Sequence, residues 1–209
     1  PPGTSTLTLH LGRSFDSGPA GLPTGESGEL SLSPQNDGAW TWGDTGTSTE
    51  EVSLRDPLNA DGHGYYSLFY QSPPLAQPTR LAGAAVLDAV VNAGPGSHLT
   101  PLLVEVLPTG ALRLVQRGFL NLDYRDGLDQ ARPGRLGEWV RGRVSFQPPE
   151  QLFAAGSRIG LILQSSNTVW AVPGAAGVVN VANGPVPGVS AVGTTLELPL
   201  VGAPLNPFA

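Results

Sequence analysis

The sequence predicts an all-β fold, arranged as an antiparallel β-sandwich with little or no helix. Apolar and polar residues alternate with a period of two in many short segments, which on a strand gives one buried and one solvated face. The 28 glycines and 21 prolines separate these segments, as turn residues do. No helical segments alternate with the predicted strands, as the parallel sheet of an α/β protein would require.

The alternating segments can be followed along the chain. The predicted inward-facing residues are Leu7, Leu9, Leu11, Leu30, Leu32, Leu112, Leu114, Leu120, Leu122, Tyr124, Val140, Val144, Phe146, Leu196, Leu198 and Leu200. Segments 81–91 and 159–163 are apolar on both faces, which predicts central strands covered on both sides. Segments 112–115 and 119–125 are either two strands or one long bulged strand. The best helix candidate is Glu150–Ala155, between Pro148-Pro149 and Gly156.

The composition limits the classes of partner. A net charge of −6 gives no general attraction to nucleic acid or to an anionic membrane, so neither is expected as a partner. The longest uncharged segment, 159–196, contains three prolines and several amides, and it therefore lacks an apolar stretch long enough to span a bilayer. The chain has no cysteine, which excludes disulfides and thiolate metal sites. It starts Pro-Pro and contains no methionine, so we expect a piece of a longer product.

Arginines are concentrated in the segment ALRLVQRGFLNLDYRD, residues 111–126. Arg113, Arg117 and Arg125 either form a binding strip or stand on the solvated face of a strand, opposite inward leucines. The second interpretation is favoured, because a nucleic-acid site would need a wider basic surface with interleaved aromatic residues.

The sequence contains no recognisable set of catalytic residues, and no cofactor or metal is predicted. The Gly-x-Ser-x-Gly motif of serine hydrolases is not present. Ser97-His98 is interpreted as a loop pair, since neighbours on a strand point apart. The three histidines, His10, His63 and His98, are too far apart in the sequence for a zinc motif.

Aspartate-containing clusters occur at two places in the sequence. Asp56, Asn59 and Asp61 do not fit the spacing of an EF-hand, and a polar turn is favoured over a looser calcium site. Asp123, Asp126 and Asp129 lie among arginines, which indicates a salt-bridged surface loop and not the carboxylate pair of a glycosidase.

Tryptophans are the candidate ligand or docking residues. Trp40 and Trp42 are two residues apart, so on a strand they share a face and could stack on a sugar. Tryptophan pairs in sandwiches are more often core or docking residues. Trp170 joins them as a candidate for a docking surface, and the uncharged segment 159–196 is itself a candidate because interface cores are depleted in charge.

Three stretches resemble a known family. They are LFYQSPPLAQPTRLAGAAVLDAVV (68–91), LLVEVLPTGALRLVQRGFLNLDYRD (102–126) and VSFQPPEQLFAAGSRIGLILQSSN (144–167). They resemble the C-terminal domain of X-prolyl dipeptidyl-peptidases and cocaine-esterase-type hydrolases. The flanks PPGTSTLTLHLG and TTLELPLV resemble its entry and closing strands. Two features depart from the family pattern: Ser157 stands where a histidine is usual, and AGPGSHLTP replaces an acidic stretch.

The resemblance implies a jelly-roll β-sandwich, similar to galactose-binding-like domains, over residues 1–209 as one accessory domain. It implies that the domain packs on an α/β-hydrolase catalytic domain of the same parent chain and helps to shape its substrate pocket, contributing no nucleophile. The parent would then be a serine peptidase or esterase. The alternative is a β-sandwich module that binds carbohydrate or a cell-wall polymer. Low charge and the Ser, Thr and Gly content are compatible with export, but nothing in the sequence requires it.

Overall fold

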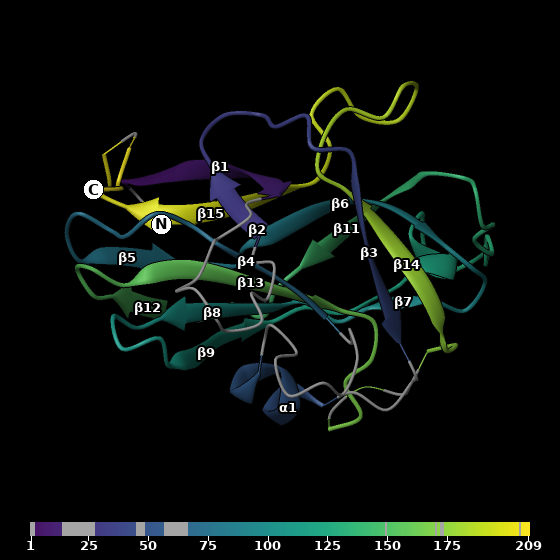
Figure 1. Ribbon diagram of the computed structural model, residues 1–209, viewed down its shortest axis with the longest axis horizontal. Coiled ribbons are helices and arrows are strands. Elements are labelled where there is room, and N and C mark those ends of the chain that lie inside the picture. The colour runs from purple at the N-terminus through teal and green to yellow at the C-terminus, as the bar shows by residue number, and fades with distance from the viewer. Residues whose placement is uncertain are drawn as a thin grey trace, which may run out of the picture.

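The computed structural model shows an all-β protein with one short α-helix among the described residues (Figure 1). It describes residues 3–13, 28–44, 49–56, 67–148, 150–169, 171, 174–204 and 206–209. The strands are β1 (Thr4–Arg13), β2 (Gly28–Ser31), β3 (Ala39–Asp44), β4 (Ser67–Gln71), β5 (Thr79–Ala82), β6 (Val86–Ala93), β7 (His98–Leu99), β8 (Leu102–Val106), β9 (Leu112–Arg117), β10 (Leu120–Asn121), β11 (Val140–Ser145), β12 (Glu150–Phe153), β13 (Arg158–Gln164), β14 (Gly177–Ala182) and β15 (Thr195–Val201). The helices are α1 (Glu50–Arg55) and a 3-10 turn, η1 (Leu122–Tyr124).

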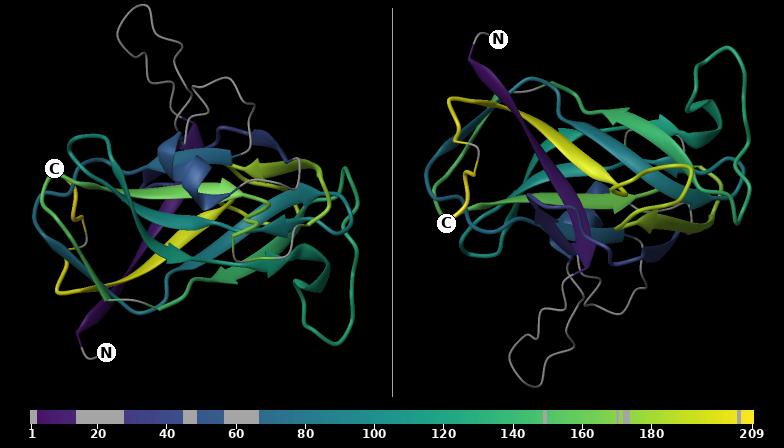
Figure 2. Two further views of the ribbon diagram at one scale, coloured as in Figure 1. Left: turned by 90° about the horizontal axis from the view of Figure 1, so that it is seen from below. Right: turned by 90° about the horizontal axis from the view of Figure 1, so that it is seen from above.

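The strands form two packed layers, which Figure 2 shows edge-on. The main path of paired strands runs β3-β14-β6-β15-β1-β2-β4-β13-β8-β9. β1 connects the layers, because its residues Thr4–His10 pair with β15 and His10–Arg13 pair with β2. β14, β6 and β15 lie in one layer, and β4, β13 and β8 lie in the other. The predicted antiparallel sandwich is confirmed, with one parallel pair, β2 and β4.

The core lies between the layers, where the predicted alternation places it. Leu7, Leu9 and Leu11 of β1 are buried, and so are the three leucines of β15, whereas the arginines of β11 point outward. A second apolar cluster covers the opposite face of the β4-β13-β8 layer, since Ile162 belongs to it while Leu161 and Leu163 belong to the main core. The prediction that segment 159–163 is covered on both faces is confirmed.

Helix α1 lies over this second cluster and was missed by the sequence analysis. The Thr49 side chain caps the helix by accepting a hydrogen bond from the Val52 N–H, and Glu50 and Glu51 occupy the first turn. Leu54 packs on the apolar face of the sheet. A threonine followed by two acids was the signal that could have identified the helix.

The predicted helix Glu150–Ala155 is wrong, because Glu150–Phe153 forms strand β12. β12 pairs with β5, so that Phe153 is fully buried while Leu152 is 59% exposed. Six residues cannot stabilise a helix by themselves, and pairing with a neighbouring strand determines the structure instead.

The chain also leaves the predicted strand 119–125 early. β10 contains only Leu120 and Asn121, after which η1 turns the chain, so the one-long-strand interpretation is wrong. Leu122 is buried as predicted, but Tyr124 is 37% exposed and is not a core residue. Leu32 is also exposed, because β2 ends at Ser31.

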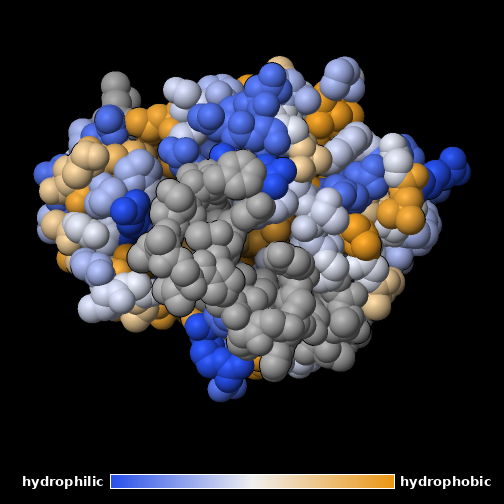
Figure 3. Space-filling model, in the orientation of Figure 1, coloured by the Kyte–Doolittle hydropathy of each residue, from blue (hydrophilic) through white to orange (hydrophobic). Residues whose placement is uncertain are grey.

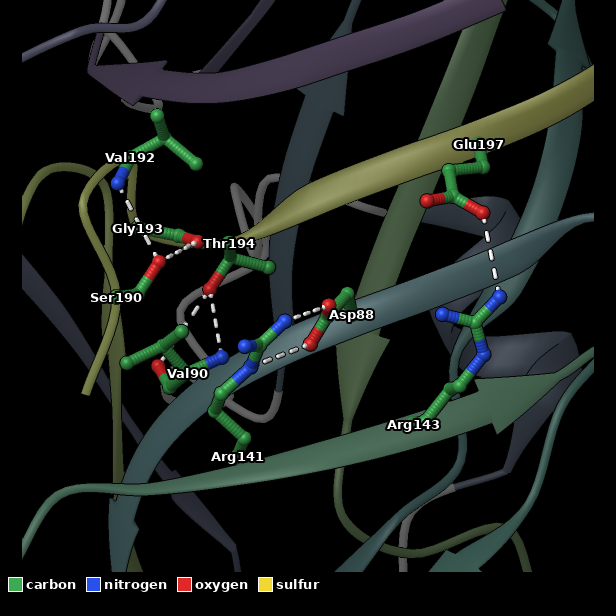
Figure 4. Close-up of polar contacts among 9 residues, drawn as sticks. All are labelled: Asp88, Val90, Arg141, Arg143, Ser190, Val192, Gly193, Thr194 and Glu197. Atoms are coloured by element: carbon green, nitrogen blue, oxygen red, sulfur yellow. Dashed lines mark hydrogen bonds and ion pairs between the residues drawn. The ribbon is translucent and has the colours of Figure 1, made fainter. Parts of the chain in front are cut away.

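The strand β6 has partners along both edges (Figure 4). β11 pairs with residues 86–91 on one edge. The other edge is divided between β15, at Val86–Asp88, and β14, at Val91–Ala93. Thr194 lies where these two strands separate, and its hydroxyl contacts the backbone of Val90.

Candidate docking surface

Trp42 is a core residue. It lies in β3 with 1% of its surface exposed, and its indole Nε1 donates to the Ser165 Oγ at 3.0 Å. Both faces of the ring are covered, so Trp42 cannot stack on a sugar. Trp170, the third candidate, lies outside the described residues.

Trp40 shares the inward face of β3 with Trp42, as the spacing predicted, and is half-buried. Its ring packs edge-on against Tyr70 at 5.4 Å, and the Arg13 guanidinium lies 5.6 Å from its centre. The Tyr70 hydroxyl donates to Asn183 Oδ1 at 2.9 Å, and burial raises the pKa of Tyr70. Trp40 therefore joins the two layers and presents only part of its ring outward.

Arg113 is exposed and Arg117 is partly buried beside α1, and both are paired. Arg113 binds the carboxylate of Glu105, a fully buried side chain of β8. Arg117 makes two hydrogen bonds of 2.6 and 2.7 Å to Glu50 of α1. The solvated-face interpretation fails for Arg125, whose side chain is only 12% exposed.

The sequence analysis predicted that Ser97 and His98 form a loop pair. This is wrong for His98, which starts β7 opposite Asn121 of β10. Both side chains are buried, and the His98 ring packs edge-on against Phe119 at 5.1 Å. Their burial leaves no room for a substrate at either side chain.

The other polar candidates do not gather into a site. Asp126 pairs with Arg132 at 3.2 Å in a surface loop, as predicted. Asp56 follows the last residue of α1 as its C-cap, whereas Asn59, Asp61 and His63 lie outside the described residues. Within the part of the chain that the structure describes, no three acidic or histidine side chains are placed to hold a metal ion, and no helix is long and apolar enough to cross a membrane.

Among the described residues, one end of the sandwich carries an uncharged depression of about 390 Å³. Its lining residues are Gly38, Ala39, Trp139, Ala182, Pro185, Val186 and Pro187. A second depression of about 400 Å³ adjoins it along residues 185–191. We call the first one the Trp139 depression. The loop after β14 projects at the upper right of Figure 1, where Figure 3 shows hydrophobic surface.

Local hydrogen bonds fix the shape of this depression. Val186 N–H donates to Ser190 O at 2.8 Å, and the Ser190 hydroxyl donates to Gly193 O at 3.0 Å. Asn183 N–H donates to Gly38 O, which ties the loop to the start of β3. Most of the lining falls in or beside the uncharged segment 159–196, so charge depletion was the sequence signal for this surface, although it did not identify Trp139.

Comparisons with known proteins give the same fold. A CocE/NonD family hydrolase from Staphylococcus aureus superposes with a TM-score of 0.68 and 11% identity, over 96% of this chain and 37% of that one. An α-amino acid ester hydrolase superposes with a TM-score of 0.67 and 15% identity, over 93% of this chain and 36% of that one. An aminopeptidase from a marine sediment Thaumarchaeota archaeon superposes with a TM-score of 0.63 and 13% identity, over 93% of this chain and 37% of that one. The chain thus spans little more than a third of each of these proteins.

The sequence itself matches one family model. No curated protein matches the chain. Residues 2–184 match the model described as the X-Pro dipeptidyl-peptidase C-terminal non-catalytic domain. This match covers most of the chain, including all three stretches that suggested the resemblance. The chain therefore belongs to the family of X-Pro dipeptidyl-peptidase C-terminal non-catalytic domains.

Proposed function

We propose that residues 1–209 form one accessory domain that packs on an α/β-hydrolase catalytic domain of the same polypeptide and helps to shape its substrate pocket. Membership of a non-catalytic family supports this proposal. So does the short span of the chain relative to hydrolases of the same fold. The catalytic domain would contribute the serine nucleophile, and this domain none.

The Trp139 depression is the observation that carries the proposal. All seven of its lining residues are uncharged, and they include two prolines, whose φ is restricted, and Gly38, whose carbonyl accepts a hydrogen bond from the Asn183 N–H. The cores of protein interfaces are depleted in charge and enriched in aromatic residues, and Trp139 supplies such an aromatic group. A surface of fixed shape loses little conformational entropy when a partner covers it.

A domain docked in this way would act on catalysis without touching the reacting atoms. By covering one side of the hydrolase pocket it would exclude water and limit the size of the substrate. The substrates would be peptides or esters, including peptides whose N-terminal X-Pro dipeptide is released.

Association in trans tests the proposal. The catalytic domain and this chain are produced separately, and binding is measured by titration calorimetry, with cleavage of Ala-Pro-nitroanilide as a second readout. Val186→Asp places a charge in the depression and should weaken binding more than ten-fold, because a charge buried without a partner at an interface costs about 2 kcal/mol or more. Leu32→Asp, on an exposed leucine outside the depression, is the matched control and should bind like the unmodified chain. Absence of any association would refute the proposal.

Carbohydrate binding is the second candidate function. Trp139, which is half-buried in a depression, is better placed to stack on a sugar than the fully buried Trp42. The likeness to galactose-binding-like domains stays a prediction. A glycan panel titrated against tryptophan fluorescence would separate the two candidates. Tight binding that Trp139→Ala abolishes, without association with a hydrolase domain, would favour the carbohydrate module.

A further inference from the structure

A projecting segment beside the Trp139 depression exposes two leucines. Residues 125–138, which we call the arm, connect η1 to β11 and extend from the end of the sandwich opposite the C-terminus (Figure 2). Leu128 is 90% exposed and Leu136 is 70% exposed, the largest values among the exposed hydrophobic side chains of the described residues. Exposed leucines are common singly, but two on one ordered projection require an explanation.

The arm is held in place by hydrogen bonds at its base. The Asp123 carboxylate accepts the Gly96 N–H through Oδ2 at 3.0 Å and the Gly134 N–H through Oδ1 at 3.2 Å. Asp123 thus joins the turn before β7 to the returning half of the arm. Arg132 N–H donates to Asp123 O at 2.6 Å, which adds a third connection.

The two halves of the arm are also joined to each other. The Arg125 guanidinium, 12% exposed, donates to Leu122 O at 2.9 Å and to Arg132 O. Gly137 N–H donates to Asn92 Oδ1 at 3.1 Å, at the end of β6. These contacts fix the backbone on both sides of Leu128 and Leu136, so the leucines are presented by an ordered scaffold and little entropy would be lost when they are covered.

Gly134 marks the closest approach of the arm to the sandwich. A Cβ atom at this position would lie 2.6 Å from Ala93 O, so only glycine allows the approach. Leu136 follows two residues later, and Trp139 lies three residues beyond Leu136. The arm therefore continues into the Trp139 depression.

The charges of the arm suit a protein partner. Arg132 and Asp126 pair with each other, and Arg135 and Glu138 are exposed with opposite signs. Apolar groups surrounded by polar residues of both signs are typical of protein interfaces. A nucleic acid or an anionic membrane would instead require an excess of positive charge.

We propose that Leu128 and Leu136 insert into the hydrolase catalytic domain of the same polypeptide, so that the arm is a second contact beside the Trp139 depression. This inference rests on the proposed function. The occupant is chosen because proteins of this fold carry almost two thirds of their length outside it, and because the family is named as a domain C-terminal in a peptidase.

Hydroxyl-radical footprinting of the longer polypeptide that contains both domains tests this directly, since labelling rates follow side-chain exposure. Leu152, 59% exposed on β12 at the other end of the sandwich, is the internal reference. We expect Leu128 and Leu136 to be labelled several-fold more slowly than Leu152, although both are more exposed than Leu152 in this domain. Equal or faster labelling of the two leucines would overturn the inference.

Labelling of Trp139 and Val186 in the same experiment separates the inference from the proposed function. If these two are protected and the leucines are not, the domains dock without the arm and only the inference fails. If all four react freely, both fail. Protection of the leucines that disappears on dilution would identify a second copy of the chain as the occupant and overturn the inference. The double variant Leu128→Asp/Leu136→Asp should also lower the thermal midpoint of domain separation, whereas Leu152→Asp should not.

Discussion

The hydroxyl of Thr194 hydrogen-bonds the backbone N–H and C=O of Val90, in the place that a neighbouring strand's backbone would otherwise take. The Val90 N–H donates to Thr194 Oγ1 at 3.0 Å, and the same hydroxyl donates to Val90 O at 3.4 Å (Figure 4). Thr194 N–H donates in turn to Ala182 O, at the end of β14. One fully buried side chain thus satisfies the edge of β6 at the position where β14 and β15 separate.

Thr194→Val should destabilise the protein by about 1–3 kcal/mol, because valine has the same shape but leaves the N–H and C=O of Val90 buried without a partner. Urea unfolding measures the change. Thr195→Val, at the adjacent position of β15, is the matched control and should change the free energy of unfolding little. Equal effects of the two substitutions would contradict this role of Thr194.

Gly193→Ala should be far more destabilising than Gly188→Ala. Both glycines have positive φ, 75° and 77°, so each alanine pays the left-handed penalty of about 1–2 kcal/mol. A Cβ at Gly193 would also lie 2.6 Å from Gly184 O and 2.7 Å from Gly184 N, whereas a Cβ at Gly188 meets nothing within 4 Å. Thermal midpoints of the two variants test the difference, and similar midpoints would show that the backbone at Gly184 can move away.

Asp123→Asn should loosen the base of the arm without unfolding the sandwich. The amide that replaces the carboxylate has one acceptor oxygen, so it can satisfy only one of Gly96 and Gly134 well. Hydrogen exchange at these two amides should become faster, while amides of β13 remain protected. Asp129→Asn, on the exposed part of the arm, is the control. Unchanged exchange at Gly96 and Gly134 would refute the role of Asp123.

The ion pair between Glu50 and Arg117 should make stability depend on pH. Hydrogen bonding to Arg117 lowers the pKa of Glu50 below its ordinary value, outweighing partial desolvation, which raises it. Since the folded-state pKa is depressed, the stabilisation is present above the unfolded pKa, about 4.3, and is lost as the pH falls through the folded pKa.

Glu50→Gln should therefore be less stable than the unmodified protein at pH 7, and the difference should diminish towards pH 3. Urea midpoints at both pH values measure it. Glu51→Gln, on the exposed neighbour of Glu50 in α1, removes a charge without that ion pair and should change much less between pH 7 and pH 3. A constant deficit for Glu50→Gln would mean that packing, and not charge, causes its effect.

Alternation of apolar residues was enough to predict the sandwich. When one face of a strand is buried, a shift of one residue would move every apolar side chain into solvent, so the pattern determines which residues face inward. Leu7, Val144 and Leu198 are all buried as predicted. The same rule failed where a strand ended early, at Leu32 and Tyr124, since local sequence does not determine where pairing stops. Glu150–Phe153 shows the reverse case, in which a distant partner, β5, converts a weak helix candidate into a strand.

The candidate docking surface was harder to predict. Low charge in segment 159–196 indicated the loop after β14, but Trp139 and Gly38 come to it from distant parts of the chain. Trp40 and Trp42 were correctly placed on one face of a strand, yet the sequence could not tell that this face is inward. Arg125 was expected in solvent, and only the folded arm provides the carbonyl groups that it binds.

The pairing of β1 with β15 has a consequence for folding, because it joins distant segments of the chain. Leu7 of β1 faces Leu198 of β15, so two strands that lie far apart in the sequence are direct neighbours in the sheet. Until β15 pairs with it, this edge of β1 presents unpaired N–H and C=O groups that can pair with a wrong strand or bind a chaperone. Contacts so distant in sequence also make folding slow, and we expect closure of the sandwich by β15 to be the late step.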